Sequence, residues 1–309
     1  MKIALIGLGD IAQKAYLPTI TQRSDVELVL CTRNQTTLDS LAKRFRIHET
    51  VQDYRALPSL KVDAVMIHSA TSSHFEIASF FLKQRIASFV DKPLADDVNQ
   101  VEQLYDLAEQ YATPLYVGFN RRHLPILTHH LPHLQQGPMT DLRVIRWEKH
   151  RYQLPGDIRT FIFDDFIHPL DSVNLCAQST LDNVQMTYQM QGAKLSRLEV
   201  QWQNSGTLYQ AVMDREFGHT NERVQIALTN QSYEFPSFTQ GQHAQRQTVT
   251  QLQLPDWTPM IDSKGFAAMI DDWLTVVRCN QLAPAIIERN LASHRLADAI
   301  YQKIVDQLS

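Results

Sequence analysis

The N-terminal segment MKIALIGLGDIAQ constrains the fold more than any other part of the chain. Residues 2–6 form a short apolar run, which is typical of a buried strand. Gly7, Gly9 and Ala12 follow with the spacing GxGxxA. After a strand and before a helix, this spacing permits a tight turn, the close approach of a pyrophosphate, and helix packing on the strand. The segment therefore predicts a dinucleotide-binding turn, and the alternative is a glycine-rich turn that binds nothing.

The start of the predicted helix adds donors to this turn. Backbone N–H groups in the first turn of a helix have no acceptor within the helix, and they lie at the positive end of its dipole. We therefore place Asp10 and Ile11 beside Gly7, Gly9 and Ala12 among the predicted cofactor-binding residues.

Strands and helices alternate up to about residue 120. Further buried strands are predicted at residues 26–32, 63–68, 86–91 and 114–119. Helices are predicted between them at residues 35–46, 74–84 and 96–111. Pro18 should kink or restart the first helix. This alternation predicts a Rossmann-like domain over residues 1–120, with a doubly wound parallel sheet.

The pattern changes in the second part of the chain. Helices are predicted at residues 122–136, 165–177, 263–279 and 288–307, with a strand at 141–151 and alternating, turn-rich segments over 184–253. Residues 121–309 are therefore expected to form an α+β domain with an open, mainly antiparallel sheet, used for substrate binding and oligomerisation. The whole chain is then an α/β protein.

The open sheet also predicts self-association. Apolar residues that would cover its open face are Leu198, Val200, Trp202, Leu208 and Val212. A solvated face does not need this much apolar surface, so we expect a homodimer or a higher homo-oligomer.

Composition limits the other partners. The 309 residues carry a net charge of −4, and no apolar run approaches the ~18 residues of a membrane span, so neither nucleic acid nor a membrane is expected. Three isolated cysteines and no signal peptide favour the cytoplasm. His129 and His133 have a metal-like spacing but no evident third ligand, and Pro132 interrupts the helix, so no metal is expected.

Two segments carry residues suited to catalysis. Lys92 ends a predicted strand before Pro93, which would direct a cation at the carboxyl edge of the sheet, and we expect a cis bond between them. Asp164, His168 and Asp171 share one face if the segment is helical, and carboxylates around a histidine suit a general base. An exposed Lys and a solvated helix face are the alternative interpretations.

Together these motifs resemble the Gfo/Idh/MocA family of nicotinamide-dependent oxidoreductases over essentially the whole chain. Beside the GxGxxA turn, the matching residues are Thr71, His74, Lys92, Pro93, Asp164 and His168. The segments GLGDIAQKAYLP, HSATSSHFE, VDKPLA, VGFNRR and DDFIHPLD are similar to the MviM-like branch. The chain departs from the family pattern at Asp91, where Glu is usual, at Ser72, where Pro is usual, and at Phe166, where Gly is usual.

The resemblance implies an NAD(P)-dependent dehydrogenase or reductase acting on a sugar, polyol or related small hydroxy compound. His168 would be the general base, Lys92 would stabilise developing oxygen charge, and Asp164 would position the substrate or His168. Thr71, His74 and Lys92 would also contribute to cofactor binding. A glycosidase of the same family that uses its nucleotide transiently, and a non-catalytic NADP-binding sensor or scaffold, are the alternatives. The ring of Phe166, where the family usually has Gly, would narrow the pocket, so a sugar-sized substrate does not follow from the resemblance alone.

The end of the second predicted strand bears on the cofactor. It carries Thr32 and Arg33 and no acidic residue that would accept hydrogen bonds from the ribose of NAD. Arg33 suits a 2′-phosphate, so NADP is favoured and NAD is the alternative. Lys149, Arg151 and Arg159 come just before the Asp164 motif and leave two interpretations open, contact with an anionic substrate group or a solvated face.

Overall fold

The computed structural model describes residues 1–137 and 139–308, which form two compact units. The first contains Met1–Phe119 and Phe266–Ile287, and the second contains Asn120–Gly265 and the chain from Glu288 onward. The sequence suggested one boundary near residue 120. Instead, the segment Phe266–Ile287, assigned to the second domain, packs in the first unit.

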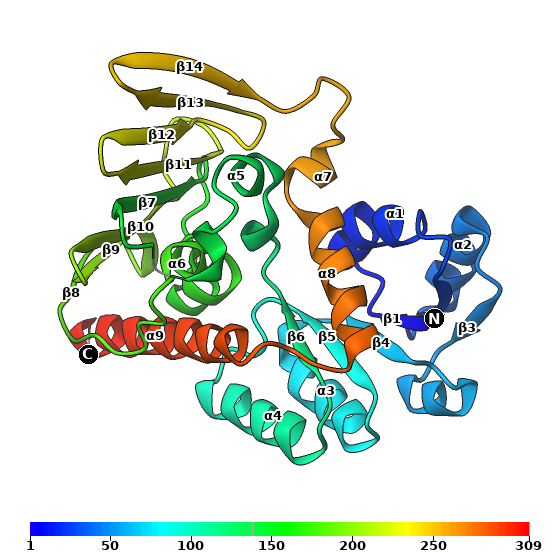
Figure 1. Cartoon of the computed structure of the whole chain (residues 1–309). Helices are drawn as coiled ribbons and strands as arrows, with labels where there is room; N and C mark the ends of the chain where they lie inside the picture. The colour runs from blue at the N-terminus through cyan, green and yellow to red at the C-terminus, as the bar shows by residue number, and fades with distance from the viewer. Residues whose placement is uncertain (138, 309) are drawn as a thin grey trace. The chain divides into compact units, whose positions relative to one another are not determined.

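The first unit is built on a parallel sheet with strand order β3-β2-β1-β4-β5-β6. Its strands are β1 (Lys2–Ile6), β2 (Glu27–Cys31), β3 (Glu49–Val51), β4 (Ala64–Ile67), β5 (Ala87–Asp91) and β6 (Leu115–Gly118). Its longer helices are α2 (Gln35–Phe45), α3 (His74–Lys83), α4 (Val98–Gln110) and α8 (Phe266–Cys279), with short 3₁₀ segments at Tyr54–Leu60 and Thr71–Ser73. Helices α3 and α4 lie on one face of the sheet and α2 on the other (Figure 1), which confirms the doubly wound fold.

The first helix restarts at Pro18, as expected. A π-helical segment, Ala12–Tyr16, leads into the short helix α1 (Leu17–Ile20), where Pro18 occupies the first turn. Proline is tolerated there because a first-turn N–H has no acceptor within the helix.

Helix α8 joins the first unit through its aromatic face. Trp273 is fully buried, with its ring centroid 6.0 Å from that of Phe89 and 5.7 Å from that of Tyr116. The Tyr116 hydroxyl donates to Asp272 over 2.8 Å. An amphipathic pattern predicts a helix with one apolar face, but it does not say which sheet that face covers.

The second unit is built on a sheet with strand order β14-β13-β12-β11-β7-β10-β9-β8. Its strands are β7 (Leu142–His150), β8 (Val184–Gln191), β9 (Lys194–Asn204), β10 (Thr207–Asp214), β11 (Asn221–Leu228), β12 (Gln231–Phe235), β13 (Gln240–Gln245) and β14 (Thr248–Gln253). Strand β7 is parallel to β10, and the other neighbours are antiparallel. The predicted mainly antiparallel sheet is confirmed, with the strand that comes first in the chain at its centre.

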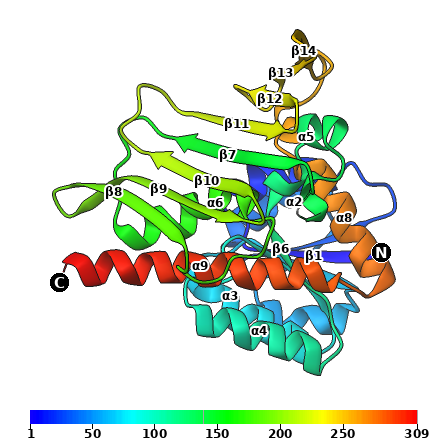
Figure 2. The same ribbon diagram turned by 60° about the vertical axis from the view of Figure 1, so that its left-hand side comes forward.

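The helices of this unit are α5 (Pro125–His130), α6 (Ile167–Val173), α7 (Met260–Ser263) and α9 (Pro284–Leu308), with 3₁₀ segments at Asn120–His123 and Leu134–Gln136 and a π-helix at Thr160–Phe166. Of these helices, α5 and α6 are shorter than predicted, α7 was not predicted, and α9 is longer than predicted. The single helix predicted at 122–136 is wrong, because Pro125 starts α5 and the helix ends before Pro132. Helix α6 packs on β7 and β10, and α9 packs on α6 (Figure 2).

The apolar residues expected on the open face of this sheet are divided between its two faces. Leu198, Val200 and Trp202 lie on the face that the helices cover, and each is at most 2% exposed. Leu208 and Val212 lie on the opposite face, among polar neighbours. The expectation of a continuous apolar open face was therefore wrong, because a period of two separates residues by face only after their strands have been paired.

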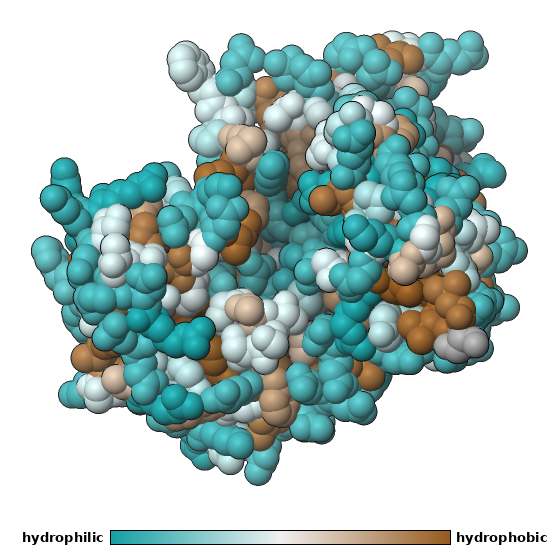
Figure 3. Space-filling view, turned by 180° about the vertical axis from the view of Figure 1, so that it is seen from behind, coloured by the Kyte–Doolittle hydropathy of each residue, from teal (hydrophilic) through white to brown (hydrophobic). Residues whose placement is uncertain are grey.

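The part of the chain that the structure describes contains no helix long and apolar enough to cross a membrane. The face of the molecule in Figure 3 is mainly hydrophilic, with small separate apolar groups. Such scattered groups are ordinary on protein surfaces.

Candidate active site

The glycine turn after β1 has the geometry of a phosphate cradle. Gly7 has φ of 85°, and a Cβ there would lie 2.4 Å from the backbone nitrogen of Ser69. At Gly9 a Cβ would meet nothing within 4 Å, so the backbone there faces open space. Ala12 is fully buried. Gly7 is therefore required by the fold itself, whereas Gly9 leaves room for a ligand, as the spacing predicted.

A cavity of about 570 Å³ adjoins this turn. It is lined by Ile6, Gly7, Leu8, Gly9, Cys31, Thr32, Arg33, Thr37, Gln52, Tyr54, Arg55, His68, Ser69, Ala70, Ser73, Glu76 and Ile77. The lining runs from the cradle to the end of β2, the edge at which open α/β sheets bind nucleotides. The residues that line the cavity therefore suit a dinucleotide. The assignment of Gly9 to its pyrophosphate, and of Thr32 and Arg33 to its adenosine end, stays a prediction.

The two glycines make a matched pair for experiment. Gly7→Ala should lower the free energy of unfolding by about 2–3 kcal/mol, because the residue would be held at positive φ against the backbone of Ser69. Gly9→Ala should leave stability nearly unchanged and weaken binding of the dinucleotide at least about tenfold, since its methyl group would enter the cradle. Chemical denaturation and fluorescence titration measure the two effects. Equal effects of both variants on stability would contradict this assignment.

Several predicted cofactor residues lie outside the cavity lining. Asp10 and Ile11 are exposed, Asp10 pairs with Lys14 over 2.8 Å, and Thr71 lies in the 3₁₀ turn before α3. These assignments stay predictions.

His74 has a positioning role in the structure. Its side chain is buried, with Nδ1 3.0 Å from the Pro93 carbonyl oxygen and Nε2 2.9 Å from that of Ser69. Carbonyl oxygens only accept, and a neutral imidazole has one N–H, so the tautomer decides which of the two oxygens accepts a hydrogen bond from the ring. His74 therefore ties the loop after β4 to the Lys92–Pro93 turn and does not face the cavity.

The turn after β5 carries Lys92. The Lys92–Pro93 peptide bond is cis, as predicted. The carboxylate of Asp91 accepts from the Lys92 backbone N–H over 2.8 Å and from the Tyr16 hydroxyl over 3.2 Å. Burial raises the pKa of Asp91, although the nearby Lys92 charge opposes this shift.

His68, the residue after β4, was not predicted from the sequence as a site residue. Its ring lies 3.9 Å from that of Tyr16, and neither ring nitrogen makes a hydrogen bond among the described residues. Burial lowers its pKa to about 3, so the ring is neutral. A buried polar ring beside an open cavity is a candidate contact for a bound nucleotide.

His168 lies in the second unit, at the start of α6 and buried. Pro169 falls in the first turn of that helix, where it is tolerated. The preceding residues form a π-helix, whose wider turn changes the direction of successive side chains. Asp164 is exposed and Asp165 is buried. The shared face of Asp164, His168 and Asp171 stays a prediction.

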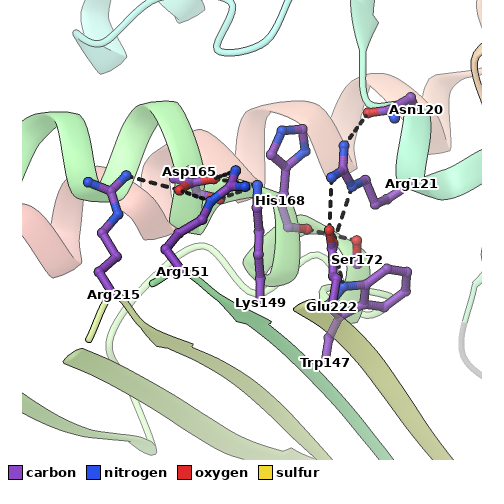
Figure 4. Close-up of polar contacts among 10 residues, drawn as sticks. All are labelled: Asn120, Arg121, Trp147, Lys149, Arg151, Asp165, His168, Ser172, Arg215 and Glu222. Atoms are coloured by element: carbon purple, nitrogen blue, oxygen red, sulfur yellow. Dashed lines mark hydrogen bonds and ion pairs between the residues drawn. The ribbon is translucent and has the colours of Figure 1, made fainter. Parts of the chain in front are cut away.

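The buried Asp165 is the centre of a charged cluster (Figure 4). Its carboxylate pairs with Lys149, with Arg151 over 2.9 Å and with Arg215 over 3.0 Å. Burial alone would raise the pKa of Asp165, but Lys149 and Arg151 hold it well below its usual range. Asp165 was not predicted from the sequence, because the i, i+4 spacing to His168 favoured its neighbour Asp164.

Asp171 lies on the buried side of α6. It accepts two hydrogen bonds from Arg122, at 2.6 and 2.9 Å, and one from Ser293 of α9 at 2.8 Å. Arg289 donates to its backbone oxygen over 2.6 Å. Burial would raise the pKa of Asp171, but Arg122 and Arg289 lower it overall. Asp171 thus anchors α6, which carries His168, to α9.

Two further charged residues of the second unit, Glu222 and the candidate Arg159, have partners of their own. Glu222 accepts from Arg121 over 2.8 Å and from the indole of Trp147 over 2.9 Å. Arg159 lies over the ring of Tyr301, 4.4 Å from its centroid. Among the described residues no group of three His, Cys, Asp or Glu side chains is arranged to hold a metal.

The doubly wound sheet, the glycine cradle and its cavity define a dinucleotide-binding protein of the Rossmann class. Residues 1–119 match the family model described as "Oxidoreductase family, NAD-binding Rossmann fold". A Gfo/Idh/MocA family oxidoreductase from Vibrio cholerae is 56% identical in a crystal structure with a TM-score of 0.98, covering 100% of this chain and 99% of that one. The chain belongs to the Gfo/Idh/MocA family of oxidoreductases.

Two further relatives extend the comparison. YceM of Salmonella typhimurium is 27% identical over 324 residues, 99% of each chain. The myo-inositol dehydrogenase Hyg17 of Streptomyces leeuwenhoekii is 24% identical over 178 residues, which cover 56% of this chain and 54% of that protein. The family and its dehydrogenase members make this protein an NAD(P)-dependent dehydrogenase or reductase.

Proposed function

We propose that the protein transfers a hydride between NADP(H) and a sugar, polyol or related small hydroxy compound. The observation that carries this proposal is the Gly7–Gly9 cradle, whose cavity extends to Thr32 and Arg33. The similarity to a myo-inositol dehydrogenase supports a polyhydroxylated substrate. The substrate is a small molecule, and neither nucleic acid nor a membrane is part of the proposal.

The proposed chemistry divides between cofactor and protein. The nicotinamide supplies the hydride acceptor or donor. In oxidation, His168 takes the proton of the substrate hydroxyl, and in reduction it returns that proton to the oxygen. Lys92 stabilises the negative charge that develops on this oxygen, and Asp164 positions the substrate or His168.

Hydride transfer is tested by a substrate screen. Sugars, sugar acids, sugar phosphates and polyols are offered with NADP⁺, and NADPH formation is followed by absorbance. A steady rise with at least one class supports the proposal. Tight NADPH binding without turnover of any compound would favour the sensor or scaffold. Release of a glycosidic leaving group without net NADPH formation would favour the glycosidase.

The preference for NADP over NAD is expected to depend on Arg33. Arg33 lines the cavity, is exposed, and makes no ion pair with a carboxylate among the described residues. A bidentate contact with a 2′-phosphate would be lost in Arg33→Ala, weakening NADPH binding about tenfold or more while NADH binding changes little. Calorimetric titration of both cofactors measures this, with Arg44→Ala, an exposed arginine of α2 outside the cavity lining, as the control. Tighter binding of NADH by the wild type would overturn the preference.

Self-association through the open face of the second sheet is a further proposal. That face carries a row of hydrogen-bonded glutamines, in which Gln201 donates to Gln185 and Gln210 donates to Gln201, each over 2.7 Å. Light scattering at micromolar concentration should give at least twice the mass of one chain. Gln201→Arg should shift the protein toward the monomer, because like charges would meet at a symmetric contact. A wild-type monomer would refute the proposal.

We also propose a cytoplasmic location. Cys31, Cys176 and Cys279 are all unbridged, which suits a reducing compartment. Fractionation of cells that express the tagged protein tests this.

A further inference from the structure

The charged cluster around Asp165 holds more positive than negative charge. Three cations, Lys149, Arg151 and Arg215, contact this one carboxylate. The side chains of Lys149 and Arg215 are only 3% and 5% exposed, and that of Asp165 only 8%. A buried charge is costly unless an opposite charge faces it, so this cluster lacks part of its counter-charge.

Neighbouring carboxylates do not remove the excess. Glu222 contacts its own cation, Arg121, through both carboxylate oxygens, at 3.2 and 2.8 Å. Asp157 is exposed, and Arg215 is the last of the influences that lower its pKa. Even when Asp157 is assigned to Arg215, the remaining two cations share the single charge of Asp165.

Arg151 is the member of the cluster that solvent reaches, because 34% of its side chain is exposed. It gives Nε and Nη2 to the carboxylate of Asp165, at 3.0 and 2.9 Å. The remaining nitrogen, Nη1, takes no part in those two bonds. The guanidinium group is planar, and this geometry suits contact with a carboxylate or phosphate. The exposed side of Arg151 is therefore where an anion would enter the cluster.

The cluster lies next to the proposed general base. Asp165 precedes His168 by three residues, and the Lys149 ammonium lies 3.5 Å from the Asp165 backbone oxygen. Figure 4 shows Lys149 and Arg151 projecting from the sheet on the side from which His168 comes. An anion held here would belong to the molecule whose hydroxyl His168 deprotonates.

We propose that Arg151 and Lys149 bind an anionic group of the substrate, so that the substrate is a sugar acid or sugar phosphate and not a neutral polyol. The proposal rests on the proposed function and narrows its substrate class. Carboxylate and phosphate share the charge and the hydrogen-bond acceptors that the cluster lacks.

The lowered pKa of Lys149 agrees with the excess of positive charge in the cluster. Burial lowers its pKa to about 7, and the charges of Arg121 and Arg151 add to the lowering, against Asp165 and Glu222. A bound anion would oppose these effects and keep the ammonium protonated. The solvated face that the sequence left open does not describe Lys149, which is 3% exposed.

The test measures anion binding directly, on the full chain saturated with NADPH. Calorimetric titrations at constant ionic strength use inorganic phosphate, malonate and, as the neutral probe, myo-inositol. Phosphate or malonate should bind saturably, and myo-inositol should bind at least about tenfold more weakly. Which anion binds more tightly tells a phosphate substrate from a carboxylate one.

Variants locate the site. Arg151→Gln should weaken the preferred anion about tenfold or more, and Lys149→Met should do the same while preserving the length of the side chain. The control is Arg223→Gln, which removes an arginine paired with Glu148 on the opposite face of the same sheet. Its anion affinity should stay within about twofold of the wild type, and far-ultraviolet circular dichroism verifies folding of all three variants.

The outcomes separate this inference from the proposed function. If neither anion binds the wild type saturably, or if Arg223→Gln weakens binding as much as Arg151→Gln, the anionic-substrate inference is overturned. NADPH binding is titrated separately on the same samples. Its failure would overturn the proposed function, whereas normal NADPH binding without anion binding would overturn only the present inference.

Discussion

His168→Ala and Lys92→Ala should each lower kcat by about 10²–10⁴-fold. Both residues are proposed to act on the same substrate oxygen, His168 by taking its proton and Lys92 by stabilising its negative charge. The double variant should therefore cost less than the product of the two single effects. Steady-state kinetics on the best substrate of the screen measure all three values.

Two controls separate catalysis from structure. NADPH should bind His168→Ala with nearly wild-type affinity, because His168 belongs to the second unit and the glycine cradle to the first. If the histidine only occupied a helix face without chemistry, His168→Ala would change kcat less than about twofold. That result would contradict the mechanism for any substrate.

The pH profile adds an independent test of His168. A general base acts when deprotonated, so the oxidation rate should rise with pH and then level off. Burial lowers the pKa of Lys149 to about 7, so a rise near neutral pH could also come from Lys149. The profile is therefore repeated in Lys149→Met, where the rise should persist if His168 causes it.

Asp171→Asn should lower the free energy of unfolding by about 3–5 kcal/mol. The Asp171 side chain is 1% exposed. The substitution removes its negative charge, which would leave the buried Arg122 and Arg289 without that carboxylate. Urea denaturation followed by circular dichroism measures the change.

A matched control exists in the first unit. Asp271 makes the same two-bond contact with an arginine, Arg23, at 2.7 and 2.9 Å, but it is 57% exposed. Asp271→Asn should therefore cost less than about 1 kcal/mol. Similar losses in Asp171→Asn and Asp271→Asn would show that burial does not determine the strength of these pairs.

The contribution of Asp171 should also depend on pH. Its pKa in the folded protein is lower than in the unfolded chain, because Arg122 and Arg289 outweigh the effect of burial. The stabilisation is then complete above the unfolded pKa, about 4, and is lost as pH falls through the lower, folded pKa. Below pH 4 the difference in stability between wild type and Asp171→Asn should shrink.

Local patterns in the sequence were sufficient for the glycine turn and the inner strands of the first unit, but not for the short edge strand β3 or for helix α8. The apolar run before Gly7 and the spacing to Gly9 and Ala12 predicted the strand, the turn and the open backbone at Gly9, because each depends on residues close in the chain. The restart at Pro18 and the cis bond before Pro93 were predicted for the same reason. The catalytic assignments of Lys92, His168 and Asp164 still await the kinetic tests.

Tertiary structure decided the features that depend on distant neighbours. Helix α8 packs in the first unit because Trp273 meets Phe89 and Tyr116 there. Leu198 and Val212 lie on opposite faces because strand pairing, not alternation alone, sets which side is covered. Asp165, and not Asp164, is the buried carboxylate. Both residues lie in the π-helix that precedes α6, and the spacing in the sequence does not reveal the wider turn of that helix. Periodicity shows which residues are apolar and how far apart they are in the chain. It does not show what covers each apolar face or which charges surround a buried carboxylate, because those neighbours belong to segments that only folding brings together.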